Sequence, residues 1–167
     1  MSFQHLGLRS EILASLTEAG YSEPTPVQEQ SIPDVLKGRD VLAGAQTGTG
    51  KTAAFGLPLL QRLLNKPGPG PRALILAPTR ELAIQIDKEI RTLARGTRIR
   101  TVTVYGGVSD RAQIQTLRKR PEIVVGCPGR VLDLLQRGEV KTPKIDTLVL
   151  DEADHMFDMG FLPDIRR

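Results

Sequence analysis

Residues 41–52 read Val-Leu-Ala-Gly-Ala-Gln-Thr-Gly-Thr-Gly-Lys-Thr: a short apolar run, then small flexible residues, then the start of a helical pattern. A strand, a glycine-rich loop and a helix in this order form the setting in which a loop binds phosphate. Backbone N–H groups freed by Gly48 and Gly50 can converge on phosphate oxygens, and the positive end of the helix dipole favours an anion there. The stretch therefore predicts a phosphate-binding loop in an α/β fold.

The loop also carries the side chains that a nucleotide and its metal need. Lys51 is expected to reach the β- and γ-phosphates, and the Thr52 hydroxyl is expected to coordinate Mg²⁺. The strict pattern has glycine where this chain has Ala45, but the tight turns fall at Gly48 and Gly50. A glycine-rich turn that binds nothing is the alternative. The residues expected to contact the nucleotide are Ala45, Gln46, Thr47, Gly48, Thr49, Gly50, Lys51 and Thr52.

A second motif, Asp151-Glu152-Ala153-Asp154, directly follows the apolar run 148–150. Ligands of open α/β sheets bind beyond the carboxyl ends of the strands, which places Asp151 to hold the metal. Glu152 is the candidate for orienting or deprotonating the attacking water. Taken alone, these acidic residues could simply cap the following helix. Together with the phosphate loop they predict a nucleoside-triphosphatase whose catalytic residues are Lys51, Asp151 and Glu152.

The rest of the chain alternates short apolar runs with helical patterns, which is typical of a parallel sheet with helices on both faces. The expected strands are 40–45, 73–77, 101–105, 123–127 and 147–150. The expected helices are 12–19, one that opens at Thr25-Pro26 and closes at Gly38, 51–64, 79–93, 109–118 and 129–137. The Gly- and Pro-rich segment 66–71 is expected to be a surface turn within one domain.

Composition limits the class of protein without identifying it. The 167 residues suit a single domain, and 23 Lys and Arg against 19 Asp and Glu give a net charge of +4, which permits an anionic partner. Basic residues cluster at 95–100, 118–120 and 166–167, where they are either solvated ends of elements or phosphate contacts.

The single cysteine, Cys127, excludes an internal disulfide and a zinc site built from cysteines. No apolar run approaches the roughly 20 residues of a membrane-spanning helix, and the N-terminus shows no secretory signal. We therefore expect a cytoplasmic protein without membrane contact.

Taken in order along the chain, the motifs resemble those of the DEAD-box RNA helicases, and the resemblance covers almost all of the chain. Residues 20–28, Gly-Tyr-Ser-Glu-Pro-Thr-Pro-Val-Gln, with Phe3 upstream, are similar to the adenine-reading Q motif of that family. The resemblance implies that the Gln28 amide hydrogen-bonds adenine, that Phe3 stacks on it and that Tyr21 belongs to the same site. An amide can donate to adenine and accept from it at once, which suits ATP.

Three further motifs are similar to the segments by which the family contacts RNA. Each directly follows an expected strand, so all should lie at one edge of the sheet, where hydroxyls, glycine amides and helix N-termini suit contacts to sugar and phosphate. Cys127 stands where the family usually has threonine, which removes a hydroxyl donor. The implied RNA-binding residues are Pro78, Thr79, Arg80, Gly106, Gly107, Pro128, Gly129 and Arg130. Asp154 is implied to couple parts of the motor within the molecule.

The resemblance implies a RecA-like P-loop NTPase domain of an ATP-dependent RNA helicase, with ATP and Mg²⁺ as cofactors. Residues 1–29 would form the Q-motif region and 30–167 an incomplete first motor domain, most similar to the RhlE-type branch. The family's Ser-Ala-Thr motif and second RecA-like domain are not found in the sequence, so we expect unpaired strands and marginal stability. We also expect weak ATP binding, poor ATP hydrolysis and no unwinding by this chain alone. The implied partners are RNA, that second domain, and ribosome-assembly or RNA-decay proteins. A DNA-acting superfamily-two translocase and a nucleotide-dependent RNA clamp are the alternatives.

Overall fold

The computed structural model describes residues 2–167, which divide into two compact units. The first unit comprises the chain up to Pro67 together with Glu89–Ile99, and the second comprises Gly68–Lys88 with Arg100–Arg167. The division falls inside one helix, α4 (Arg80–Leu93). The phosphate loop belongs to the first unit and the acidic motif to the second.

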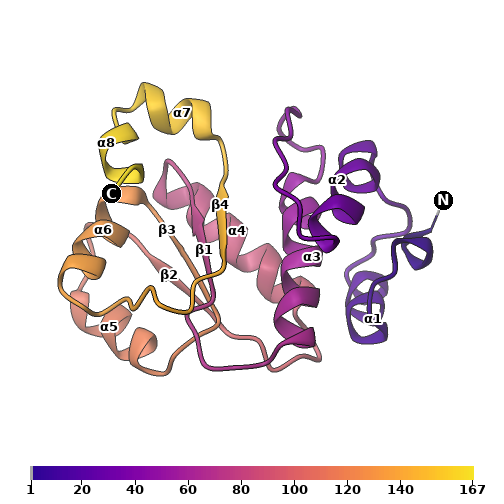
Figure 1. The fold of residues 1–167 in the computed structure, drawn as a ribbon, viewed down its shortest axis with the longest axis horizontal. Helices are drawn as coiled ribbons and strands as arrows, with labels where there is room; N and C mark the ends of the chain where they lie inside the picture. The colour runs from indigo at the N-terminus through magenta and orange to yellow at the C-terminus, as the bar shows by residue number, and fades with distance from the viewer. Residues whose placement is uncertain (1) are drawn as a thin grey trace. The chain divides into compact units, whose positions relative to one another are not determined.

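The first unit is helical (Figure 1). It contains the 3-10 turn η1 (Phe3–Leu6) and the helices α1 (Ser10–Glu18), α2 (Pro26–Leu36) and α3 (Lys51–Asn65). Gln61 of α3 is buried and satisfied, because its amide accepts a hydrogen bond from Arg9 N and donates one to Gly7 O, both at 2.8 Å. These two bonds attach the start of α1 to the middle of α3, and α2 packs along α3.

The second unit is built on a parallel sheet of four strands in the order β2-β3-β1-β4. The strands are β1 (Ala73–Leu76), β2 (Thr101–Val104), β3 (Ile123–Gly126) and β4 (Thr147–Leu150). Their last residues are in register, since Leu76 pairs with both Gly126 and Leu150, and Val104 pairs with Gly126. All four carboxyl ends therefore lie level at one edge of the sheet.

Helices cover both faces of this sheet (Figure 1). On one face, alternate strand residues pack against the helices α5 (Asp110–Arg118), α6 (Pro128–Gln136), α7 (Ala153–Asp158) and α8 (Leu162–Ile165). The core of this face consists of Leu74, Leu76, Val102, Val104, Leu117, Val124, Val131, Leu134, Val140 and Met156. On the other face, Asp87 of α4 accepts a short hydrogen bond from the Thr101 hydroxyl, and both side chains are buried. The expected α/β fold is confirmed.

One expected strand is wrong. Residues 40–45 form no strand, and Val41 and Leu42 are 42% and 100% exposed. An apolar run becomes a strand only when a neighbouring backbone takes its hydrogen bonds, and no such neighbour occurs among residues 2–167. The other four strands are confirmed to within a residue, as are the six expected helices to within two or three. β4 is an edge strand, and its Leu148 is 55% exposed, so the expected unpaired edge is present there.

The close packing of α6 on β3 predicts a cost for any side chain at Gly126. A Cβ at this position would lie 2.6 Å from Val104 Cγ2 and 2.7 Å from Val131 Cγ2. We expect Gly126→Ala to lower the free energy of unfolding by about 1–3 kcal/mol through overpacking. Urea denaturation measures this, with Gly129→Ala as the control, because a Cβ at Gly129 meets no atom within 4 Å. Equal stabilities of the two variants would contradict the packing described here.

Candidate nucleotide and RNA site

The phosphate loop has the backbone geometry that anion binding requires. Gly48 and Gly50 have φ of +79° and +82°, the left-handed region that glycine adopts without strain. Gly50 precedes α3 as its N-cap and supplies no side-chain cap, so the first amides of this 15-residue helix remain for a ligand. Lys51 Nζ donates to Ala45 O at 2.8 Å, which holds the ammonium over its own loop. These groups fit a phosphate.

Gln28 is not a solvent-facing helix residue, because only 1% of it is exposed. Its Oε1 accepts a hydrogen bond from Thr25 N, and its Nε2 donates one to Gly50 O, both at 3.0 Å. The Thr25 hydroxyl donates to Thr49 O at 2.8 Å. The start of α2 is thereby fastened to the phosphate loop by two side chains. The amide that the resemblance assigns to adenine is the same amide that holds the loop here.

The two aromatic residues implied at the adenine site lie against each other. The rings of Phe3 and Tyr21 meet edge to face with centroids 6.3 Å apart, and Phe3 is 4% exposed. The Tyr21 hydroxyl donates to Glu89 Oε1 at 2.9 Å, and burial together with the Glu89 charge raises the pKa of Tyr21 to about 12. Phe3 is thus a core residue in this structure, and Tyr21 stays neutral and anchored.

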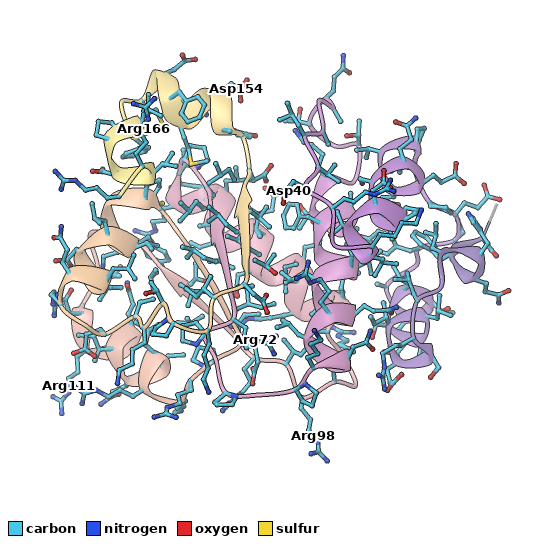
Figure 2. The ribbon with its side chains drawn as sticks, in the orientation of Figure 1. Asp40, Arg72, Arg98, Arg111, Asp154 and Arg166 are labelled. Carbon is cyan, nitrogen blue, oxygen red and sulfur yellow. The ribbon has the colours of Figure 1, made fainter. Side chains whose placement is uncertain are left out.

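The acidic motif sits at the junction of β4 and α7. Asp151 is 9% exposed, its N–H donates to Leu76 O of β1, and its Oδ1 accepts from Glu152 N at 3.1 Å. Glu152 adopts φ 52°, ψ 50°, a left-handed conformation that costs a non-glycine residue about 1–3 kcal/mol. Its carboxylate lies 3.4 Å from His155 Nδ1. Asp154 lies on α7 at the end nearest β4 (Figure 2).

The sites implied for RNA all follow strand ends of the same sheet. The Thr79 hydroxyl accepts from Leu82 N at 3.2 Å and so caps α4. The Arg80 guanidinium lies over the Tyr105 ring, 4.8 Å from its centroid. Gly106 and Gly107 are exposed in the loop after β2, whereas Pro128 is buried and Gly129 is exposed in the first turn of α6. The level carboxyl ends bring these segments and Asp151 to one edge, as expected.

Arg130 differs from the expectation of a side chain that meets phosphate. Only 10% of its side chain is exposed, and its guanidinium donates to Asp110 Oδ1 at 2.6 Å, Asp133 Oδ2 at 2.7 Å and Gln113 Oε1 at 3.3 Å. Arg137 joins the same two carboxylates at 2.8 and 3.2 Å. In this structure the Arg130 side chain therefore fastens α5 to α6. The sequence analysis did not predict this network. Its only local signal is that Asp133 lies three residues after Arg130 and four before Arg137, which places the three side chains on one face of a helix.

Cys127 is the N-cap of α6 and stands half-buried at the end of β3. Burial, with a smaller contribution from the charge of Glu81, raises the pKa of its thiol. The thiol therefore stays protonated at neutral pH and is a weak donor at a position where the resemblance implies a threonine hydroxyl.

Residues 2–167 contain neither a cluster of side chains that could hold a metal ion nor a helix that could cross a membrane. This part of the chain contains no cluster of three or more His, Cys, Asp or Glu side chains that could hold a metal ion. Mg²⁺ typically uses only one or two carboxylates and completes its shell with water and nucleotide oxygens, so the Asp151 carboxylate and the Thr52 hydroxyl are each a donor of a kind that it accepts. Among the same residues, no helix has both the length and the apolar character needed to cross a membrane.

The contacts of Gln28 predict a loss of stability when the amide is removed. Gln28→Ala leaves Thr25 N and Gly50 O without their partners, and we expect the free energy of unfolding to fall by about 1–3 kcal/mol. Chemical denaturation measures this. Gln30→Ala is the matched control, because Gln30 is exposed on the same helix. A loss of equal size in the control would rule out a special role for the amide.

The carboxylate and arginine network predicts a pH dependence. Hydrogen bonding to Arg137, then to Arg130, holds the pKa of Asp110 below its usual 3.8. A lowered folded-state pKa stabilises the fold fully above pH 3.8, and this contribution is lost as pH falls through the folded-state value. We expect Arg137→Gln to flatten the fall in stability below that pH, as measured by thermal melts from neutral to strongly acidic pH. Arg111→Gln on α5 should keep the wild-type slope.

Known proteins resemble this chain closely. A relative, the ATP-dependent RNA helicase CshA of Limosilactobacillus reuteri, is 51% identical over 165 residues, which are 99% of this chain and 33% of that protein. The crystal structure of a DEAD box protein from Methanococcus jannaschii matches 99% of this chain with a TM-score of 0.93 and 41% identity, over 45% of its own length. The crystal structure of a hypothetical ATP-dependent RNA helicase from Sulfolobus tokodaii matches 95% of this chain, with a TM-score of 0.88 and 38% identity, over 46% of its length.

The chain thus spans about a third of this curated relative and under half of these solved structures. The expectation of an RhlE-type branch receives no support from them. The family model for DEAD/DEAH box helicases matches residues 25–167, from the residue that caps α2 to the end of the chain. The phosphate loop, the acidic motif and the three strand-end motifs all fall within that range, and the chain belongs to the DEAD/DEAH box helicase family.

Proposed function

We propose that this chain binds ATP with Mg²⁺ and the backbone of RNA as a motor domain of an ATP-dependent RNA helicase. The observation that carries the proposal is the level edge of the four-stranded sheet, where Asp151 and the three strand-end segments emerge together. Its relative CshA is named an ATP-dependent RNA helicase, which agrees with this use of the edge.

The roles of the residues follow from their chemistry. The amides of the phosphate loop and of the first turn of α3 bind the phosphates, and Lys51 exchanges its bond to Ala45 O for phosphate oxygens. Thr52 of the first unit and Asp151 of the second are the residues that would hold Mg²⁺, which would supply positive charge against the phosphates. Glu152 positions the attacking water and accepts its proton.

Adenine recognition falls to the side chains around the start of α2. Gln28 presents one acceptor and one donor, a pair that matches an adenine edge when its bonds to Thr25 N and Gly50 O are exchanged for the base. Phe3 stacks on adenine in this proposal, which requires its buried ring to leave its edge-to-face contact with Tyr21. Base binding and the position of the loop at Gly50 therefore draw on the same amide.

RNA is bound through its backbone rather than its bases. Thr79, Arg80 and the exposed glycines at 106, 107 and 129 offer hydroxyl, cationic and amide donors, none of which distinguishes one base from another. Arg130 contributes by fixing α6 and its first turn, where Pro128 and Gly129 lie. A second RecA-like domain is the proposed partner of this domain, and Asp154 is proposed to couple parts of the motor. The proposed place of action is the cytoplasm, with proteins of ribosome assembly or RNA decay as further partners.

The role of Lys51 predicts a loss of nucleotide affinity. We expect Lys51→Ala to weaken ATP binding by about ten-fold or more, because a charge-assisted bond to phosphate is lost. Titration of a fluorescent ATP analogue measures this. Lys37→Ala is the control with the same change of charge, since Lys37 is exposed at the end of α2. Unchanged binding by the Lys51 variant would refute the phosphate site.

The role of Glu152 predicts that its substitution lowers ATP turnover and leaves ATP binding nearly unchanged. We expect Glu152→Gln, measured together with the proposed second RecA-like domain, to keep ATP affinity within about two-fold and to lower RNA-stimulated ATP turnover by at least about 10², the scale of a lost general base. Turnover measured with and without RNA provides the test. ATP-dependent RNA binding without turnover in the wild type would favour a clamp, and stimulation by DNA alone would favour a DNA translocase.

A further inference from the structure

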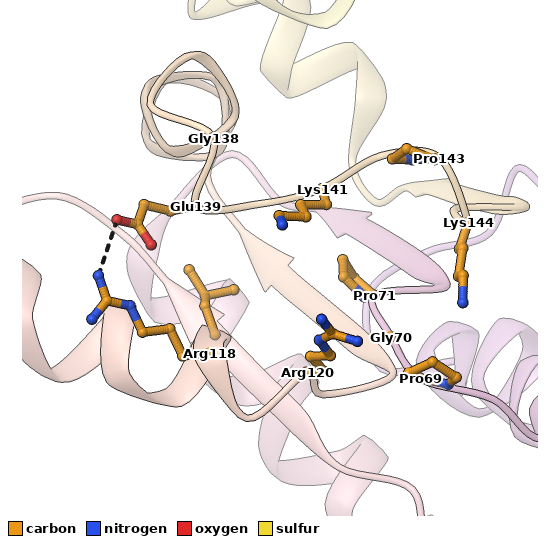
Figure 3. Close-up of a pocket in the computed structure, with 11 residues that line it drawn as sticks. Pro69, Gly70, Pro71, Arg118, Arg120, Gly138, Glu139, Lys141, Pro143 and Lys144 are labelled. Carbon is orange, nitrogen blue, oxygen red and sulfur yellow. Dashed lines mark ion pairs between the residues drawn. The ribbon is translucent and has the colours of Figure 1, made fainter.

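A pocket of about 500 Å³ opens in the second unit at the edge of the sheet opposite to the strand-end motifs (Figure 3). Its lining residues come from the segment just before β1, from the end of α5 and the turn that leads to β3, and from the segment that leads into β4. This volume lies in the range of ligand sites, about 300–1,000 Å³. The family motifs and the proposed function use no residue of this pocket.

The lining is strongly cationic. Arg118, Arg120, Lys141 and Lys144 line the pocket with a single carboxylate, Glu139, which gives a net charge of +3. The whole chain carries +4, so this region concentrates most of its net charge. Arg118 pairs with Glu139 at 3.6 Å, and the structure of residues 2–167 records no ion pair for the other three cations.

Two constrained backbone positions, Arg120 and Gly70, shape the pocket. Arg120 has φ +54°, a left-handed conformation that glycine adopts more easily and that costs a non-glycine residue free energy. Its carbonyl accepts from the Arg100 guanidinium at 3.4 Å. Gly70 makes the other wall, and a Cβ there would clash with the Pro121 carbonyl. Figure 3 shows Arg120, Lys141 and Lys144 around Pro71, with Arg118 turned towards Glu139.

We propose that this pocket binds an acidic, extended peptide segment of a partner protein. Three prolines and Leu117 give it apolar walls, which suit the side chains between the carboxylates of such a peptide. Its lining contains no aromatic ring, the group on which single-stranded RNA bases stack. The opposite edge of the sheet carries the RNA motifs, so a peptide held here leaves RNA binding free.

The test uses a fluorescent oligoglutamate peptide and the whole chain, with fluorescence anisotropy at low and physiological salt. We expect salt-sensitive binding that falls about ten-fold or more in Lys141→Glu and in Arg120→Gly. Glu139→Gln should tighten binding about two-fold or more, because it removes the competing carboxylate. Arg111→Glu is the matched charge reversal on α5, outside the pocket and exposed (Figure 2), and should bind as the wild type does.

Two readouts separate the proposal from its alternatives. Arg120→Gly should melt at the same temperature as the wild type or higher, because glycine relieves the left-handed backbone, so lost binding cannot be ascribed to unfolding. Affinity for an oligouridylate should stay within about two-fold in all variants. Peptide affinity that is unchanged in Lys141→Glu overturns the proposal. A parallel loss of RNA affinity also overturns it and assigns the pocket to RNA.

Discussion

The in-register parallel pairing of four strands is the constraint on which the functional reading of the second unit depends. Because Leu76, Val104, Gly126 and Leu150 end their strands at one level, the chain must leave the sheet four times along one line. Every residue that follows a strand is then delivered to that line, whatever its distance in sequence. A shift of register by one residue would turn each strand's core residues to the opposite face as well as displace the edge.

The phosphate loop depends on a different kind of constraint, the satisfaction of backbone groups by side chains. A glycine loop with left-handed residues has carbonyls and amides that no regular element satisfies. Here Thr25, Gln28 and Lys51 take the carbonyls of Thr49, Gly50 and Ala45. The backbone N–H groups of the loop remain for an anion. Side chains of the protein thus bind the carbonyl oxygens of the loop, and a ligand can bind its N–H groups.

Most of the fold could be predicted from the sequence because hydrophobic periodicity is a local property. The runs at 73–77 and 123–127 are apolar throughout, and they form buried central strands. Residues 41–45 are apolar as well and form no strand, because pairing depends on a neighbouring strand that the run itself does not specify. The level edge could be predicted too, since any residue after a parallel strand must lie there.

The contacts at the site that the sequence did not predict have a common origin, because they join residues distant in sequence. Gln28 lies 22 residues from Gly50, and Arg130 lies 20 from Asp110, so neither partner is visible in the motif that contains the residue. A motif identifies which side chains are present, and the fold determines which of them are already hydrogen-bonded within the protein. A ligand can bind the Gln28 amide only by breaking its hydrogen bonds to Thr25 N and Gly50 O. The affinity of the ligand therefore measures the free energy of the new hydrogen bonds minus that of the two that are broken. The exposed glycines after the strands have no side-chain hydrogen bond to break before a ligand binds, whereas Gln28 and Arg130 have side chains that already hold the site in place.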